Sequence, residues 1–325
     1  MLPTRHPFQS FWFGDTFSPY EKVCLQSFVD HGHEFHVYTY TKNLEVPSGV
    51  LVKDAREILS DEGYFTYGSG PGKGSHAAFS NLFRYRLLAE RGGWWVDTDV
   101  VCLKDTLPQY RSFYAFENDR IVNGAILYFE PNDPIMRNCF EEASRIGDTA
   151  AWGELGPRLL SRMLAEGGCI EHAQNKQLAY EIHHSEAFDL LRPEMCQTLM
   201  QRTHNSLFIH LWNEMFRRAS LSKTMLPPKG SLLRLFVDRH PVDGWTGEYN
   251  AEVLESLLRL NTELSQGHAE VRYLRRQTES LKLSEAKLAN KLVRVSEELR
   301  YHKRHPLRIL ARTLPSAILA LLRKS

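Results

Sequence analysis

Two aspartates follow an apolar segment of the chain, where residues 92–104 read GGWWVDTDVVCLK. Asp97 and Asp99 lie two positions apart, so on an extended chain their carboxylates point to the same side. Carboxylate oxygens suit Mg²⁺ or Mn²⁺, and such a cation also binds phosphate oxygens. Bound across a diphosphate, the cation offsets the negative charge that grows as a nucleoside diphosphate leaves. The pair therefore predicts metal-dependent chemistry on a nucleotide sugar.

A second chemistry uses the same residue pattern. Haloacid-dehalogenase-like phosphatases present a nucleophilic aspartate in DxDx[TV] after an apolar strand, and residues 97–101 (DTDVV) satisfy this pattern with Asp97. That chemistry also needs a downstream lysine and a pair of acids that binds a metal ion after another strand. The downstream aspartates do not form such a pair; they are Asp133, Asp148, Asp189, Asp238 and Asp243. On the sequence alone, the phosphatase stays an alternative.

The elements that must position the two aspartates are a helix and a strand, separated by two glycines. Residues 75–91 (SHAAFSNLFRYRLLAER) carry apolar side chains at helical spacing, and Ser75 is a suitable N-cap. Gly92 and Gly93 end this helix, because glycine adopts left-handed backbone without strain. Aromatic and β-branched residues predict further strands at 7–14, 34–40, 112–117 and 123–130. We therefore expect an α/β domain over residues 1–245.

Composition excludes several classes of protein. With 325 residues, 42% hydrophobic and 24% charged, the chain is neither disordered, collagen-like nor a disulfide miniprotein. Lys and Arg number 40 against 39 Asp and Glu, so no nucleic-acid partner is expected. Five widely spaced cysteines without a CxxC pair predict reduced, buried thiols. No apolar run is long enough for a signal peptide or a membrane span, which predicts a cytoplasmic protein.

The composition changes after about residue 245. Residues 250–300 contain no proline and one glycine, and apolar residues recur in steps of three and four. This pattern predicts a long helix over 246–300 with a coiled-coil seam, and hence a homo-oligomer of undetermined number. Residues 301–325 form a basic amphipathic tail with six basic residues and no acid. Such a tail suits an anionic membrane surface, and packing of the tail on the protein is the alternative.

Several segments resemble one known family in the order of its motifs. FSNLFRYRLLAERGGWWVDTDVVCLK is similar to the core signature of the DXD-containing glycosyltransferases. This group includes yeast initiating α-mannosyltransferases, α-1,4-galactosyltransferase-like enzymes and, remotely, clostridial toxin glucosyltransferases. NGAILYFE resembles the middle strand of the family, WGELGPRLLSRML its Gly-Pro helix and FIHLWNE its closing motif. The resemblance covers about residues 8–239 and implies a GT-A-type fold, in which helices flank a mostly parallel sheet.

The resemblance also implies roles for the residues around the two aspartates. Asp99 would principally bind the metal, Mn²⁺ or Mg²⁺, and Asp97 would bind donor hydroxyls and the metal's water. Arg84 would contact a phosphate or a donor-sugar hydroxyl, since its planar fork suits both. At Asn81 the family more often has aspartate, which weakens inferences about the donor sugar. Asn123 would act at the catalytic centre on the acceptor side.

Two further segments would complete the donor site. Trp12, with Phe13 and Gly14 beside it, would line the pocket of the nucleotide base by stacking. In FIHLWNE, His210 would supply a nitrogen ligand to the metal, while Trp212 and Asn213 would close over the diphosphate. These assignments follow from the positions of the motifs in the family.

The resemblance implies a retaining enzyme that moves a hexose or N-acetylhexosamine from a UDP- or GDP-sugar to a glycan or lipid-linked acceptor. The departing phosphate would accept the proton of the acceptor, so no aspartate or glutamate base is required. With the basic tail, this activity would suit bacterial surface polysaccharide synthesis at the inner face of the cytoplasmic membrane. A non-catalytic scaffold, with a degenerate sugar-nucleotide domain on a coiled coil, is the alternative from another class. The retained acids at positions 97 and 99 argue against the scaffold.

Overall fold

The computed structural model describes residues 6–68, 70 and 72–304. The chain forms two compact units, Met1–Leu258 and Arg259–Ser325. The first unit holds all the residues that the sequence analysis proposes for the site.

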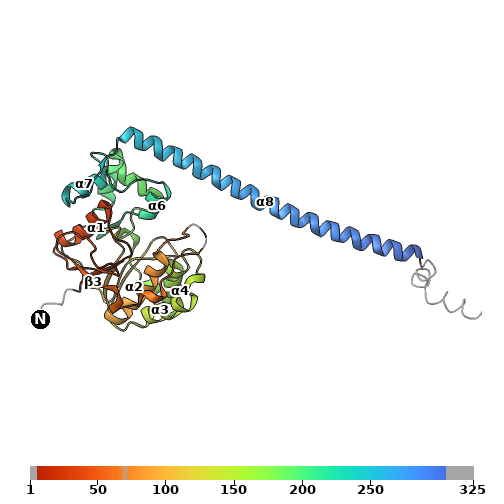
Figure 1. Cartoon of the computed structure of the whole chain (residues 1–325), viewed down its shortest axis with the longest axis horizontal. Helices are drawn as coiled ribbons and strands as arrows, with labels where there is room; N and C mark the ends of the chain where they lie inside the picture. The colour runs from red at the N-terminus through yellow and green to blue at the C-terminus, as the bar shows by residue number, and fades with distance from the viewer. Residues whose placement is uncertain (1–5, 69, 71, 305–325) are drawn as a thin grey trace, which may run out of the picture. The chain divides into compact units, whose positions relative to one another are not determined.

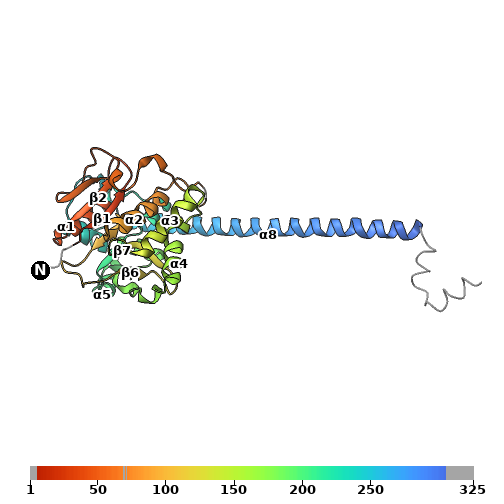
Figure 2. The same ribbon diagram turned by 90° about the horizontal axis from the view of Figure 1, so that it is seen from below.

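A six-stranded sheet forms the centre of the first unit (Figure 2). Its strands, in spatial order, are β3 (Val50–Asp54), β2 (Phe35–Thr39), β1 (Phe8–Trp12), β4 (Gly93–Val96), β7 (Val122–Phe129) and β6 (Phe113–Phe116). The strands β3, β2, β1 and β4 pair parallel with one another, and β7 pairs antiparallel with both β4 and β6. The sequence analysis did not predict β3, because this edge strand leaves Leu51 and Val52 exposed and has no clear apolar pattern.

The sheet is buried on both faces, which explains the nearly continuous apolar composition of its inner strands. Successive side chains point to opposite faces, so Trp94 and Val96 pack in one core and Trp95 in the other. Helices α1 (Pro19–Asp30), α5 (Cys196–Arg202) and α7 (Leu232–Arg239) contribute to the first core. Helices α2 (Ala77–Arg91), α3 (Pro134–Ile146) and α4 (Leu159–Glu166) contribute to the second and lie side by side (Figure 1). The expected α/β fold, a mostly parallel sheet flanked by helices, is confirmed.

Helix α2 leads into β4 as the sequence predicts, although it begins two residues later than Ser75. His76 is its N-cap residue, and Ser75 Oγ accepts a hydrogen bond from Ala77 N at 3.3 Å. At the other end, Gly92 has φ 63° and its N–H bonds to Leu88 O. A Cβ at Gly92 would lie 2.5 Å from the backbone nitrogen of Pro131, so only glycine fits here.

Two small sheets and one short helix complete the first unit. β5 (Val100–Cys102) pairs antiparallel with β8 (Phe208–His210), and β9 (Met225–Leu226) pairs with β10 (Gly247–Glu248). Helix α6 (Asn213–Arg218) follows β8 after Leu211 and Trp212. The pairing of β5 with β8 brings the segment after the two aspartates next to the FIHLWNE segment.

The expected long helix is α8 (Ala251–Arg304). Its first turns belong to the first unit, where Leu254 and Leu258 are buried. Further along, apolar side chains are exposed, including Leu264, Leu281 and Leu292. The expected boundaries at residues 245 and 300 and the coiled-coil pairing stay predictions. Within the described residues, no helix has the length and apolarity to span a membrane. Most of the predicted basic tail, residues 305–325, lies outside the described residues.

Candidate active site

The segment Asp97–Thr98–Asp99 connects the central sheet to the small β5–β8 sheet. Asp97 directly follows β4, and its N–H donates to Ala125 O of β7 at 2.8 Å. Asp99 directly precedes β5, and its carbonyl oxygen accepts from Leu211 N at 2.8 Å. Backbone bonds to two distant segments therefore fix both aspartates.

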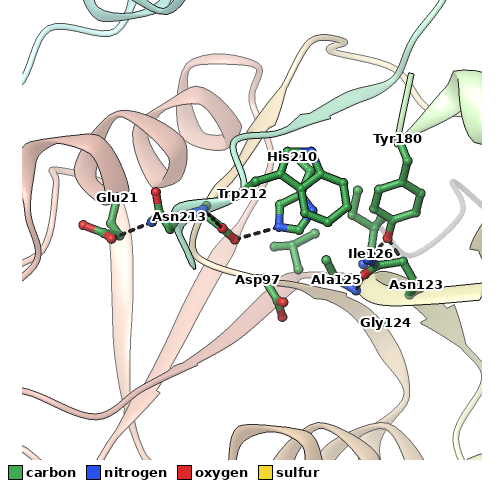
Figure 3. Close-up of polar contacts among 12 residues, drawn as sticks. Glu21, Asp97, Asn123, Gly124, Ala125, Ile126, Tyr180, His210, Trp212 and Asn213 are labelled. Atoms are coloured by element: carbon green, nitrogen blue, oxygen red, sulfur yellow. Dashed lines mark hydrogen bonds and ion pairs between the residues drawn. The ribbon is translucent and has the colours of Figure 1, made fainter. Parts of the chain in front are cut away.

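The carboxylate of Asp99 is held by the FIHLWNE segment, whose His210 and Asn213 are labelled in Figure 3. Oδ1 of Asp99 lies 3.1 Å from His210 Nε2, and Oδ2 accepts from the backbone N–H of Asn213 at 2.8 Å. Burial favours the neutral acid, but the opposing effects of His210 and the Asn213 N–H are stronger and lower the pKa of Asp99 to about 2. Burial likewise opposes the charged imidazole, yet the charge of Asp99 raises the pKa of His210. Asp99 is therefore an ionised carboxylate beside a histidine.

Trp212 turns the chain so that the Asn213 N–H meets Asp99. Its backbone is left-handed, with φ 59° and ψ 52°, which is rare for a bulky residue and costs about 1–2 kcal/mol. The indole N–H donates to Ile182 O at 2.8 Å, and the ring lies 4.0 Å from that of His210, centroid to centroid. Burial of the indole holds the strained turn in place. The indole N–H is thus committed to the core, and the expected closure over a diphosphate stays a prediction.

The carboxylate of Asp97 is held by two donors. Its Oδ1 accepts from Trp95 Nε1 at 2.8 Å and from Arg84 Nη2 at 3.1 Å. Arg84 also donates from Nη1 to Gly124 O at 2.5 Å, and its guanidinium lies 5.0 Å from the Trp95 ring centroid. Arg84 is buried, so its planar fork joins Asp97 to β7. Arg84 thus contacts Asp97 and β7, and its expected contact with the donor stays a prediction.

Asp97, Asp99 and His210 form a group suited to a divalent cation. One ligand atom from each lies within 4.8 Å of the others. Two carboxylates and one imidazole fit Mn²⁺ or Mg²⁺, since both cations prefer oxygen ligands and Mn²⁺ also takes nitrogen. The three residues that the sequence analysis proposed as metal ligands are therefore together in the structure.

Two cavities meet at these residues, and both are lined by Asp97 and Asp99. The larger has a volume of about 820 Å³, and its lining includes Trp12, Phe13, Lys73, Asn213, Arg217 and Lys223. The smaller has a volume of about 430 Å³, and its lining includes Asn81, Arg84, Glu117, Asn123, His184 and His210. A molecule bound in one cavity could therefore contact a molecule bound in the other at Asp97 and Asp99.

The proposed base-binding residues lie at the larger cavity. Trp12 packs on Phe17 with ring centroids 4.3 Å apart, and Phe13 stacks on Tyr64 at 4.2 Å. Phe13 is 38% exposed, so an aromatic face is available to a ligand. Gly14 has φ 149°, and a Cβ there would lie 3.2 Å from Trp12 Nε1. On the side of the smaller cavity, Asn81 Nδ2 donates to Ala77 O of its own helix at 2.7 Å.

The structure adds a buried glutamate that the sequence analysis missed. Glu21 is 1% exposed, accepts from Asn213 Nδ2 at 2.6 Å and forms an ion pair with Lys223. It also accepts from Ser18 N at 3.1 Å, which makes Ser18 and Glu21 a capping box at the start of α1. The spacing S-x-x-E is visible in the sequence, but its link to the site depends on residues about 200 positions away.

Hydrogen bonds hold both ends of the side-chain amide of Asn123. Its Nδ2 donates to Glu117 Oε2 at 2.8 Å, and its Oδ1 accepts from Ala125 N at 2.8 Å. Tyr180, shown beside it in Figure 3, accepts from Ile126 N at 3.1 Å. The amide of Asn123 therefore directs the carboxylate of Glu117, a second residue that the sequence analysis missed.

Comparison with known families fits this geometry. A family model described as "Glycosyltransferase sugar-binding region containing DXD motif" matches residues 18–117, and one described as "Alpha 1,4-glycosyltransferase conserved region" matches residues 128–234. The first range contains both aspartates, and the second contains His210. Both matches support the resemblance of the chain to the DXD-containing glycosyltransferases.

Several individual glycosyltransferases are similar to this chain in sequence or structure. The human alpha-1,4-N-acetylglucosaminyltransferase is 32% identical over 85 residues, which is 26% of this chain and 24% of that protein. The mouse lactosylceramide 4-alpha-galactosyltransferase is 24% identical over 159 residues, which is 45% of this chain and 43% of that protein. The chain thus spans less than half the length of these relatives. Among solved structures, the apo form of the glycosyltransferase GlyE from Streptococcus pneumoniae TIGR4 is 12% identical with a TM-score of 0.40, covering 74% of this chain and 61% of that chain.

Proposed function

We propose that this protein is a metal-dependent retaining glycosyltransferase that moves a sugar from a nucleoside diphosphate donor to the hydroxyl of a glycan acceptor. The observation that carries the proposal is the meeting of Asp97, Asp99 and His210, which come from two distant segments, at the junction of two cavities. A phosphatase that uses Asp97 as its nucleophile is less consistent with this site, because Trp95 and Arg84 already bond Oδ1 of Asp97. The family also argues for sugar transfer.

The larger cavity suits the donor. Its lining combines the aromatic residues Trp12 and Phe13 with the cationic residues Lys73, Arg217 and Lys223. Aromatic faces stack on a nucleotide base, and cations attract phosphate groups. The donor proposed here is a UDP- or GDP-sugar with its diphosphate directed toward Asp99.

Asp97, Asp99 and His210 would hold Mn²⁺ or Mg²⁺. When bound there, such a cation offsets the charge on the departing diphosphate. The protein supplies the fixed positions of these ligands: Arg84 and Trp95 orient Asp97, and the Asn213 N–H orients Asp99. Fixed ligands cost little reorganisation during the reaction.

The transfer forms a bond between the acceptor oxygen and C1 of the sugar while the bond from C1 to the phosphate oxygen breaks. The acceptor's proton moves to the departing diphosphate, and the α configuration is retained. The names of the similar relatives, an alpha-1,4-N-acetylglucosaminyltransferase and a 4-alpha-galactosyltransferase, support an α-linked product of a hexosyl or N-acetylhexosaminyl donor. We further propose a lipid-linked acceptor in bacterial polysaccharide synthesis at the inner face of the cytoplasmic membrane, on the composition of residues 301–325.

Donor hydrolysis without acceptor tests the proposed function. The full chain is incubated with UDP-galactose, UDP-N-acetylglucosamine or GDP-mannose and Mn²⁺, and the released nucleoside diphosphate is measured. We expect slow hydrolysis of one donor that stops in excess EDTA. The change Asp99→Asn should lower the rate by several orders of magnitude, while Asp119→Asn, at an exposed aspartate outside both cavities, should leave it unchanged. Full turnover in EDTA, or normal rates in Asp99→Asn, would contradict the proposal, and a scaffold would hydrolyse none of the donors.

A further inference from the structure

Glu117 lies at the smaller cavity, directly after strand β6. Its N–H donates to Ile121 O at 2.8 Å and closes the turn that leads into β7. Its side chain is 13% exposed and lines the cavity together with Asp97, Asp99 and Asn123. A carboxylate in this position faces the same space as the proposed metal ligands.

The contacts of Glu117 fix its carboxylate and leave some of its hydrogen-bond acceptor positions free. Oε2 accepts from Asn123 Nδ2 at 2.8 Å, and Oε1 lies 3.4 Å from Nδ1 of His184. Asn123 cannot turn away, because its Oδ1 is held by the N–H of Ala125. An ionised carboxylate offers about four positions for accepted hydrogen bonds, so Glu117 retains capacity for a ligand hydroxyl.

The other acids that line this cavity have stronger partners. Asp97 accepts from Arg84, and Asp99 from His210 and the Asn213 N–H. Glu214 pairs with Arg217 and Arg218. Within the described lining, Glu117 is thus the carboxylate that neither an arginine nor a backbone N–H holds, and its ion-pair partner is His184, at 3.4 Å.

We infer that Glu117 binds the hydroxyl of the acceptor that attacks the donor sugar. This inference rests on the proposed function, and it names the chemistry of the acceptor: a neutral hydroxyl, because a carboxylate accepts from O–H and repels an anion. Glu117 accepts a hydrogen bond from this hydroxyl and directs the oxygen lone pair toward C1. The oxygen–C1 bond forms while the C1–phosphate bond breaks, and the hydroxyl proton passes along this hydrogen bond to Glu117, which then gives it to the departing diphosphate. Asn123 and His184 are positioning residues, since they act through Glu117.

Donor hydrolysis tests this inference with water as the acceptor probe. In Glu117→Gln, one carbonyl oxygen must serve both the Asn123 amide and the water molecule, so we expect kcat for hydrolysis to fall about ten- to a hundredfold. The donor KM and the binding of donor with Mn²⁺, measured by calorimetry, should stay unchanged, because the inference places the acceptor, and neither of these ligands, at Glu117. Glu142→Gln is the matched control, at a glutamate with arginine partners that lines neither cavity.

A second variant keeps the test valid if Glu117→Gln does not fold. The side chain of His184 is 45% exposed, so His184→Ala should not disturb the fold. We expect a two- to fivefold loss of kcat at unchanged donor KM, and recovery in His184→Asn, whose side-chain amide can take the place of the imidazole beside Oε1. If His184 only supported the fold, its replacement would not lower kcat alone at unchanged donor KM, and asparagine would not restore kcat.

Three results would overturn the inference. One is an unchanged kcat in folded Glu117→Gln, and another is a raised donor KM at unchanged kcat. The third involves Zn²⁺, since Glu117, His183 and His184 place ligand atoms within 4.8 Å of one another. If Glu117→Gln abolishes the binding of Zn²⁺ alone and leaves hydrolysis intact, the cluster is a metal site. A wild-type protein that hydrolyses no donor would instead contradict the proposed function, so the two failures are distinct.

Discussion

Replacing Arg84 should destabilise the fold and the site together. Arg84 donates one charge-assisted hydrogen bond to Asp97 and one to the carbonyl of Gly124. Removing one member of a buried ion pair costs about 3–5 kcal/mol, but the side chain of Asp97 is 31% exposed and water compensates in part. For Arg84→Met we therefore expect the free energy of unfolding to fall by about 2–3 kcal/mol. Arg84→Lys keeps the charge but cannot reach both acceptors, and about 1 kcal/mol should be lost.

Urea denaturation of four proteins measures the free energy of interaction between Arg84 and Asp97. The proteins are the wild type, Arg84→Met, Asp97→Asn and the double variant, which form a double-mutant cycle. We expect a coupling free energy of about 1 kcal/mol or more, because the two side chains contact each other. Losses that add within about 0.5 kcal/mol would refute the reasoning, since residues that do not interact are additive to that extent.

A glycine variant separates the position of Arg84 from its charge. A Cβ at Gly124 would lie 2.1 Å from Nη1 of Arg84, so Gly124→Ala should displace the guanidinium from Asp97. We expect donor hydrolysis to fall in Gly124→Ala, although the arginine is still present, because Asp97 loses its contact with the guanidinium. Gly63→Ala is the matched control, since nothing lies within 4 Å of a Cβ there. Normal hydrolysis in folded Gly124→Ala would show that the contact of Arg84 with Asp97 is not needed.

Three further predictions concern other parts of the chain. Burial lowers the pKa of His240 despite its contact with Asp30, so the unfolded chain binds a proton more readily than the folded chain. The free energy of unfolding should therefore fall as pH drops below about 6.5. His240→Gln should reduce this pH dependence in thermal unfolding, and an unchanged dependence of the melting temperature on pH would contradict the reasoning. Ending the chain after Leu258 keeps the buried start of α8 and removes its exposed leucines. We expect fewer chains per particle by light scattering, and an unchanged number would contradict assembly through α8. Deleting residues 301–325 should weaken sedimentation with anionic vesicles at low salt, and equal sedimentation would exclude the membrane tail.

The strands and the helix before the aspartates could be predicted from the sequence because their patterns are local. Gly92 and Gly93 ended helix α2 as expected, and the apolar residues before Asp97 form β4. Edge strand β3 was missed, since exposed Leu51 and Val52 give no alternation. Local pattern reports which side chains are buried, not which distant segment covers them.

In the candidate site too, local features could be predicted from the sequence and contacts between distant segments could not. The proximity of His210 to the aspartates followed from the order of the family's motifs, and spacing alone did not supply it. The bond from Asn213 to Glu21 joins residues 192 positions apart, and no sequence pattern indicates it. The left-handed turn at Trp212 was equally unpredictable, because its residue type disfavours that backbone and buried packing holds it.

The connection between the two sheets at Asp97–Thr98–Asp99 has a consequence for local stability. A ligand that binds both carboxylates and His210 ties strand β4 to the β5–β8 ladder, so separating that ladder also requires releasing the ligand. At a concentration a hundred times the dissociation constant, this adds about 2.7 kcal/mol to the opening free energy. The amides of Val101 and Ile209, which face each other in the ladder, would then exchange with deuterium roughly a hundredfold more slowly. Ligand binding would in this way stabilise the β5–β8 ladder before any acceptor arrives.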